Sequence, residues 1–176
     1  MRITKHIAAL RADRRGVAAI EFAVFAALIS LGMLNVTDIA VYVYQRMQVE
    51  YATQAGAQAA WHTCDINHLP ATNNCSGLNT AVQNAVQGTS LGTRVALQSG
   101  SPAEGYYCVN SSNALQYVAD VNHKPTDCSS VGSPGLAPGD YIQIATTFAY
   151  APMFPGITVT GAFTTPITRT ALMRLG

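Results

Sequence analysis

The first residues that could support chemistry lie at the start of a long apolar run. Gly16 follows two arginines and precedes Val17, and Glu21 is the only acid in the segment 17–37. A carboxylate inside a membrane-length helix costs roughly 2.5–3.5 kcal/mol on insertion scales and is by default a functional-site hypothesis. A cut between Gly16 and Val17 would leave a new α-amine just over one helical turn from Glu21. Glu21 therefore lies within reach of a positive charge placed at the start of this helix.

The four cysteines all lie beyond this apolar run, at Cys64, Cys75, Cys108 and Cys128. An even number on one side of a membrane segment predicts two disulfides in an oxidising compartment. Three pairings are possible. We favour Cys64–Cys75 and Cys108–Cys128, because each would close a short loop that contains turn residues, which is worth about 3 kcal/mol in the chain-entropy model.

A metal site is the alternative for the first two cysteines. His62 and His68 lie close to Cys64 and Cys75 in the sequence. Their spacing matches no usual zinc pattern, and the chain has no Cys-x-x-Cys motif. We therefore expect disulfides, no metal and no cofactor.

One pattern could be mistaken for a catalytic site. Residues 88–92, Gly-Thr-Ser-Leu-Gly, match the nucleophile elbow formally, and Asp120 and His123 follow Ser90 in the order found in hydrolases. An elbow needs a buried strand before the serine and a helix after it. Here a helical pattern precedes the serine and a strand pattern follows. We expect a chance match and no enzyme, and we keep a small periplasmic hydrolase as a remote alternative.

Charge along the chain predicts how the apolar run is oriented. Five of the ten Lys and Arg residues fall within residues 1–16, whereas residues 46–176 hold five basic and six acidic residues. By the positive-inside rule, 1–16 is a cytoplasmic leader and the chain beyond residue 44 is translocated. The nearly neutral remainder offers no electrostatic footprint for nucleic acid.

The apolar run itself is long enough to remain as a membrane helix. Residues 22–44 reach roughly 34 Å at 1.5 Å per residue, against a hydrocarbon core of about 30 Å. A cleavable secretory signal has a shorter core and a small-residue cleavage site, which we do not find here. Asp38 is a second acid in the run. We expect it to serve helix packing as a polar intramembrane residue, or to lie near the far interface, where its cost falls.

The segments beyond the membrane predict an α+β fold. Alanine-rich residues 45–62 continue the helix, so that one long helix covers about 17–62. A cysteine-bearing loop follows, and apolar positions at helical spacing predict a short helix over 78–86, with Gly88 as its C′ residue. Period-two alternation over 140–150 is the clearest strand signal. Shorter strands are expected at 94–98, 106–110, 157–163 and 167–172, giving an antiparallel sheet.

The residues around Gly16 carry a resemblance to a known family. Residues 15–23, Arg-Gly-Val-Ala-Ala-Ile-Glu-Phe-Ala, resemble the opening of TadE-like proteins, the minor pilins or pseudopilins of the tight-adherence (Flp) type IV pilus. The likeness continues through Asp38 and the alanine-rich segment 52–60. It returns in 139–155 and in the closing strand that ends at 169–172. The cysteine-rich middle is unmatched, and Trp61 stands where the family commonly has a basic residue.

The resemblance implies a structural role. A prepilin peptidase would cut after Gly16, and Glu21 would pair with the new amine of a neighbouring subunit and so set the register of assembly. The partners would be this peptidase, other pilins, inner-membrane assembly proteins and membrane lipid. The chain would lie in the bacterial inner membrane as a single-pass protein, or in a pilus at the cell surface.

These observations predict four segments and leave two hypotheses for the function. We expect a cytoplasmic leader over 1–16, a transmembrane helix over 17–44, its periplasmic extension over 45–62, and a disulfide-stapled periplasmic α+β domain over 63–176. The main hypothesis is that the chain is a minor pilin. The alternative is an uncleaved, signal-anchored envelope protein whose periplasmic domain binds a partner.

Overall fold

The computed structural model describes residues 15–163 and 165–176. The expected basic leader 1–16 lies, apart from its last two residues, outside these described residues. The elements in chain order are α2 (Arg15–Thr63), η1 (Ile66–His68), α3 (Ala71–Asn74), α4 (Leu78–Gln87), η2 (Gly92–Arg94), β1 (Val95–Leu97), β2 (Ala103–Val109), β3 (Leu115–Asp120), η3 (Ser129–Val131), β4 (Gly139–Phe148), η4 (Val159–Ala162) and β5 (Ile167–Arg174). The α+β class is as the sequence predicts.

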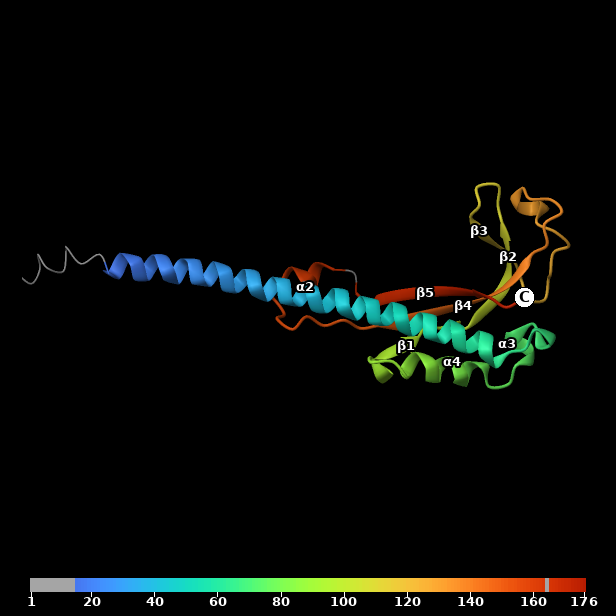
Figure 1. The fold of residues 1–176 in the computed structure, drawn as a ribbon, viewed down its shortest axis with the longest axis horizontal. Helices are drawn as coiled ribbons and strands as arrows, with labels where there is room; N and C mark the ends of the chain where they lie inside the picture. The colour runs from blue at the N-terminus through green and yellow to red at the C-terminus, as the bar shows by residue number, and fades with distance from the viewer. Residues whose placement is uncertain (1–14, 164) are drawn as a thin grey trace, which may run out of the picture. The chain divides into compact units, whose positions relative to one another are not determined.

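The helix α2 is continuous over 49 residues, which confirms the long helix expected over 17–62 (Figure 1). It contains no proline, and strong helix formers dominate it. Several of its hydroxyl side chains bond to the backbone of the helix itself. The hydroxyls of Ser30 and Thr37 donate to the carbonyls of Ala26 and Met33 at 2.7 and 2.9 Å. These bonds satisfy the hydroxyls without a second helix.

The described chain forms two compact units, and each is considered by itself. The helix–loop unit comprises α2 up to Tyr42 together with residues Ala151–Phe163. The sheet unit comprises Val43–Tyr150 and Thr164–Gly176. Because α2 contributes to both units, its two halves have different neighbours.

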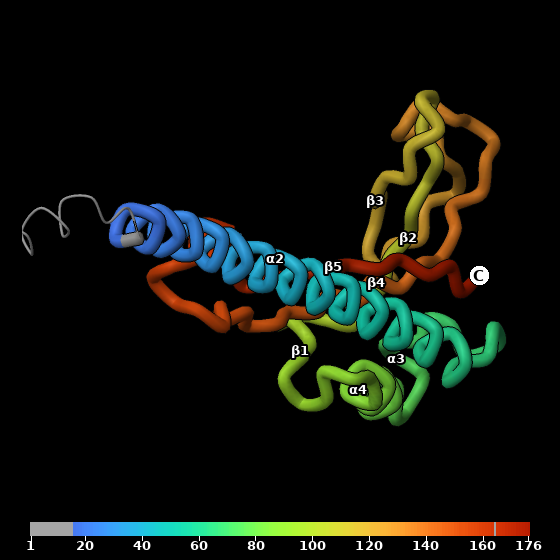
Figure 2. The backbone as a smooth tube through the Cα atoms, turned by 60° about the vertical axis from the view of Figure 1, so that its left-hand side comes forward, coloured from blue at the N-terminus to red at the C-terminus, as the bar shows by residue number. Residues whose placement is uncertain are grey.

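The sheet unit is built around β4. All strand pairs are antiparallel. β5 pairs with one edge of β4 over residues Tyr141–Phe148, and the other edge is shared by β2 and β1. β3 adds to the outer edge of β2, and this hairpin extends away from α2 and α4 (Figures 1 and 2). The strand expected at 140–150 is confirmed, with alternate residues buried from Ile142 to Phe148.

The core of the sheet unit depends on small residues in α2. A Cβ added at Gly56 would lie 2.7 Å from Cγ2 of Val86 and 3.3 Å from Cγ2 of Ile144. At this point α2 therefore approaches both α4 and β4 too closely for a larger side chain. Thr53 and Thr146 share a buried hydrogen bond of 2.6 Å that joins α2 to β4. The alanine-rich segment is thus a packing surface as well as a good helix former.

The short helix expected at 78–86 is present as α4, but its end differs. Gly88 is the C-cap residue with φ −71°, a right-handed conformation, rather than a left-handed C′ residue. The hydroxyl of Thr89 donates to the carbonyl of Val86 at 2.9 Å. This bond satisfies one terminal carbonyl, so the left-handed turn is not needed.

The strands differ from those expected at two places. Residues 157–163 form no strand; they belong to the loop that contains η4. The sequence analysis also missed β3 (Leu115–Asp120), which is mostly exposed on both faces and therefore lacks a burial pattern. Its hairpin with β2 is closed by Asn110, whose Oδ1 accepts from the backbone amides of Ser112 and Ala114, both at 2.9 Å.

Candidate functional site

The first half of α2 exposes apolar side chains on all sides. Val17, Ile20, Phe22, Phe25 and Ile29 are each more than half exposed. The helix is long and apolar enough to cross a membrane, and none of its most apolar 18-residue window is buried within the described chain. A helix that is hydrophobic all round is normally a core helix or a membrane span. Since the first half of α2 is not covered by other described residues, its surface favours a membrane anchor.

The expected processing residues lie at the beginning of this helix. The Gly16–Val17 bond lies within α2, of which Arg15 is the first described residue. Glu21 lies four residues after Val17 on the same helix face and is exposed. Within the described residues Glu21 makes no hydrogen bond and no ion pair. Its carboxylate is available to a group outside this part of the chain.

The second acid of the apolar run, Asp38, is fully buried. The structure surrounds its carboxylate with donors from the segment Ala151–Phe163. The backbone amides of Met153 and Phe154 donate at 2.9 and 3.3 Å, and the hydroxyls of Thr158 and Thr160 donate at 2.7 and 3.4 Å. The sequence leaves helix packing and a position near the far membrane interface open for Asp38. In the structure its carboxylate also holds a distant segment of the same chain.

Two further residues of α2 hold the same segment. The side-chain oxygen of Asn35 accepts from the backbone amide of Val159 at 2.9 Å, and the Tyr42 ring lies 4.8 Å from that of Phe163 between centroids. Asn35, Asp38 and Tyr42 have the spacing i, i+3 and i+7, which places them on one helix face. That spacing was visible in the sequence. The segment that it binds was not, because 115 or more residues separate these side chains from their partners.

The four cysteines form two disulfides. They join Cys64 to Cys75 and Cys108 to Cys128, which is the local pairing that the sequence favours. The first bond connects the chain after α2 to the segment before α4, and the second connects β2 to the segment before η3. Both sulfurs that the alternative metal site would require are therefore bonded to each other. Within the described residues no group of three or more His, Cys, Asp or Glu side chains is placed to hold a metal ion.

The formal hydrolase pattern is not assembled. The Ser90 hydroxyl donates to Oε1 of Gln48 at 2.5 Å, whereas Nδ1 of His123 lies 2.8 Å from Oδ1 of Asp120. No hydrogen bond among the described residues joins Ser90 to His123. Asp120 and His123 are both largely exposed. The His123 hydrogen bond lowers the pKa of Asp120, as expected for a surface carboxylate beside an imidazole.

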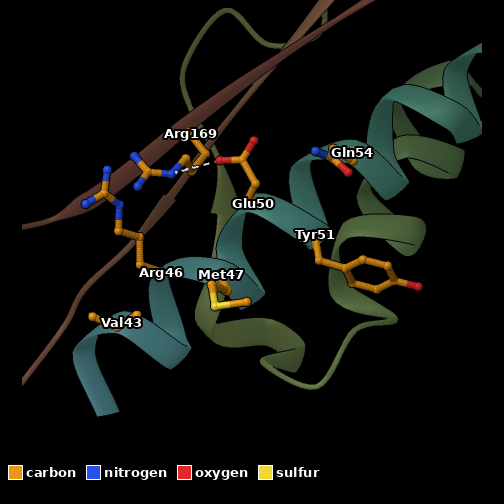
Figure 3. A pocket seen from close by; sticks show the side chains of 7 residues that line it. All are labelled: Val43, Arg46, Met47, Glu50, Tyr51, Gln54 and Arg169. Atoms are coloured by element: carbon orange, nitrogen blue, oxygen red, sulfur yellow. Dashed lines mark ion pairs between the residues drawn. The ribbon is translucent and has the colours of Figure 1, made fainter. Parts of the chain in front are cut away.

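A groove of about 500 Å³ lies along α2 in the sheet unit (Figure 3). It is lined by Val43, Arg46, Met47, Glu50, Tyr51, Gln54 and Arg169. Met47 and Tyr51 are 64% and 62% exposed, a large apolar area for a folded domain. Nε of Arg169 lies 2.9 Å from Oε2 of Glu50, and this ion pair closes one side of the groove. The groove thus combines an apolar floor with charged residues at its edge.

A second acidic pair lies in the sheet unit, and the sequence analysis did not identify it. Asp140 is 5% exposed, and its Oδ1 has no hydrogen-bond partner within the described residues. Burial and the neighbouring Glu104 raise the pKa of Asp140 to about 6. Glu104 itself accepts from the backbone amides of Ala71 and Thr72 at 2.7 and 2.6 Å. This pair is best understood as part of the fold, because Glu104 ties α3 to β2.

Comparison of this chain with protein-family models, with curated proteins and with solved structures finds no match. The functional argument therefore rests on the residues and their geometry.

Proposed function

We propose that this chain is a minor pilin or pseudopilin of a tight-adherence (Flp) type IV pilus. A prepilin peptidase removes the leader after Gly16, and residues 17–44 anchor the chain in the bacterial inner membrane until it is assembled. Its partners are that peptidase, other pilins and the inner-membrane proteins of pilus assembly. The observation that carries this proposal is Glu21, an exposed carboxylate on an uncovered apolar helix that has no hydrogen bond or ion pair with any other described residue.

The physical argument concerns the charge of Glu21. A carboxylate left alone in lipid or among packed apolar helices is strongly disfavoured. Processing creates a positive α-amine at Val17, and a neighbouring subunit can present this amine to Glu21. The pair neutralises both charges only when the two helices have the correct axial offset. Glu21 therefore acts as a register device, as polar groups do in other helical assemblies.

The groove along α2 supports the same role. Helical subunits associate by burying apolar surface, and exposed Met47 and Tyr51 supply such a surface beyond the membrane segment. Val43 lies one turn before Met47 on the same face. A neighbouring subunit's helix that packs here would continue the contact that begins at Glu21.

The test is the mature N-terminus together with the effect of Glu21. N-terminal sequencing of protein from the native membrane should read from Val17. Glu21→Gln and Glu21→Ala should abolish incorporation into pili while leaving the protein in the membrane. Ser30→Ala is the matched control, because Ser30 is a polar residue of the same helix whose hydroxyl bonds only to its own backbone. An unprocessed chain together with normal piliation by Glu21→Ala would refute the proposal.

One observation favours the alternative of an uncleaved, signal-anchored envelope protein. The Asp38 carboxylate is satisfied within its own chain, so the helix–loop unit needs no neighbouring subunit to complete it. In that case the N-terminus remains unprocessed, and charge reversal of Glu21 spares partner binding once the helix is inserted. The same N-terminal sequencing separates the two functions.

A further inference from the structure

The segment Ala151–Phe163 has its polar side chains turned inward and its apolar side chains turned outward. Thr158 and Thr160 point to Asp38, while Ile157 and Val159, which alternate with them in the sequence, are 55% and 56% exposed. Met153 is 58% exposed, although its backbone amide also donates to Asp38. A loop that faces water shows the opposite arrangement. This inversion is what an apolar surrounding medium would require.

The composition of the segment agrees with its arrangement. No charged residue occurs between Tyr141 and Thr168. Pro152 and Pro155 flank Met153 and Phe154. Prolines have no amide hydrogen that needs an acceptor. The amides of Met153, Phe154 and Val159 are all bonded to Asp38 or Asn35. Irregular backbone is tolerated at membrane depth only when its polar groups are satisfied in this way.

The position of the attachment points along α2 indicates the depth. Asn35, Asp38 and Tyr42 follow Val17 by 18, 21 and 25 residues, or roughly 27, 32 and 38 Å of helix at 1.5 Å per residue. A hydrocarbon core is about 30 Å thick. If the span begins near Val17, the three attachment points lie at its outer end. The segment is thereby held at the outer end of the hydrocarbon core.

We propose that residues 151–163 form a membrane-contacting loop in the outer leaflet. Met153, Ile157 and Val159 lie among lipid chains, and Asp38 is the tether that holds the loop at this depth. The partner is the lipid bilayer. The surface is continuous with the uncovered apolar face of α2 in the same unit. This inference depends on a membrane-spanning α2 and is independent of pilus assembly.

The experiment measures quenching of a single tryptophan by lipids with brominated chains. The full chain, in a Trp61→Phe background, is reconstituted at one copy per nanodisc with Ile157→Trp as the probe. We expect blue-shifted emission that brominated lipid quenches strongly. Leu136→Trp, which replaces an exposed apolar residue of the sheet unit, is the matched control and should not be quenched. Equal quenching at both positions would overturn the inference.

The other outcomes have definite meanings. Red-shifted emission from position 157 that is quenched by aqueous iodide places the loop in water and overturns the proposal. Blue-shifted emission that neither quencher affects shows that protein covers the loop, which also overturns the proposal.

Adding Asp38→Ala should reduce lipid quenching at position 157. Thr158→Val removes one hydrogen-bond donor to Asp38 and preserves the shape of the side chain. It tests the tether in the same way if Asp38→Ala fails to fold. Quenching that neither variant reduces would show that Asp38 is not the tether.

Discussion

The hydroxyl of Thr158 donates to the carboxylate of Asp38 at 2.7 Å, across 120 residues of sequence. This bond belongs to a set that also includes the amides of Met153 and Phe154. An acid in an apolar helix can be satisfied either by another molecule or by its own chain. Here the two acids of the apolar run differ: Asp38 is satisfied by its own chain, and Glu21 has no hydrogen bond or ion pair within the described residues. The contrast gives Asp38 a role in the fold, and the proposed function gives Glu21 the role in assembly.

We expect Asp38→Ala to release the segment 151–163 from α2. The substitution leaves the amides of Met153 and Phe154 without an acceptor, and each buried amide that loses its partner costs about 1–3 kcal/mol. Limited proteolysis of the full chain in detergent should show faster cleavage within 151–163. Glu21→Ala is the control and should leave cleavage unchanged, because Glu21 makes no hydrogen bond or ion pair within the described residues. Equal cleavage of Asp38→Ala and the unmodified chain would contradict the tether.

A second prediction concerns the close approach at Gly56. Gly56→Leu places a side chain where a Cβ alone would lie 2.7 Å from Cγ2 of Val86. Overpacking of this kind costs about 1–3 kcal/mol, and denaturant unfolding of the sheet unit should shift accordingly. Gly32→Ala is the control, since a Cβ there meets nothing within 4 Å. It should be neutral or slightly stabilising, because alanine is favoured over glycine in helices.

The sequence predicted those elements whose pattern is local and strong. The long helix follows from length, composition and the lack of proline, and β4 follows from strict alternation between Ile142 and Phe148. The same rule failed at Ile157 and Val159. Their alternation arises from packing around Asp38 and not from a sheet, and Pro155 and Gly156 just before them form a turn with φ +81° at the glycine.

The candidate site was predictable only in part. Gly16 and Glu21 can be singled out from the sequence alone, because the pairing proposed for them depends on residues that are close in sequence. The pairing of Asp38 with Thr158 depends on a fold that brings distant residues together, and one sequence contains no signal for it. The acid pair of Asp140 and Glu104 was missed for the same reason, since β2 and β4 place them together.

We expect the two disulfides to contribute about equally to stability. They close loops with sequence separations of 11 and 20, so chain entropy gives each about 3 kcal/mol. Replacing Cys64 and Cys75 together, or Cys108 and Cys128 together, by alanine should lower the denaturation midpoint by similar amounts. A thiol assay on denatured, non-reduced protein should find no free thiol. Four free thiols would contradict the pairing.

Ser90→Ala should leave the biological role of the protein intact. The Ser90 hydroxyl bonds to Gln48, and no described hydrogen bond links it to His123. If the chain is the proposed pilin, we therefore expect normal amounts of protein, normal processing and normal piliation. His123→Ala should behave in the same way. Loss of piliation from Ser90→Ala, with folding preserved by circular dichroism, would revive the hydrolase alternative.

The last prediction is a pH dependence of stability that arises from Asp140. Its pKa is raised from 3.8 to about 6 in the folded chain, by burial first and by Glu104 second, while Lys124 acts in the opposite direction. Between these two values the folded chain binds more protons at this site than the unfolded chain does. The contribution of Asp140 to the free energy of unfolding is therefore fully present below pH 3.8 and is lost as the pH rises through about 6.

Asp140→Asn tests this assignment, because asparagine stays neutral and its amide can donate to Glu104. The variant should be more stable than the unmodified chain at pH 7.5, by about 1–3 kcal/mol. It should also lose the fall in Tm between pH 4 and pH 7. Asp127→Asn is a useful control: the pKa of Asp127 is lowered by hydrogen bonds from Ser129 and Gly135, so its removal should destabilise the fold at neutral pH. If Asp140→Asn kept the full pH dependence of the unmodified chain, another group would have to be its source.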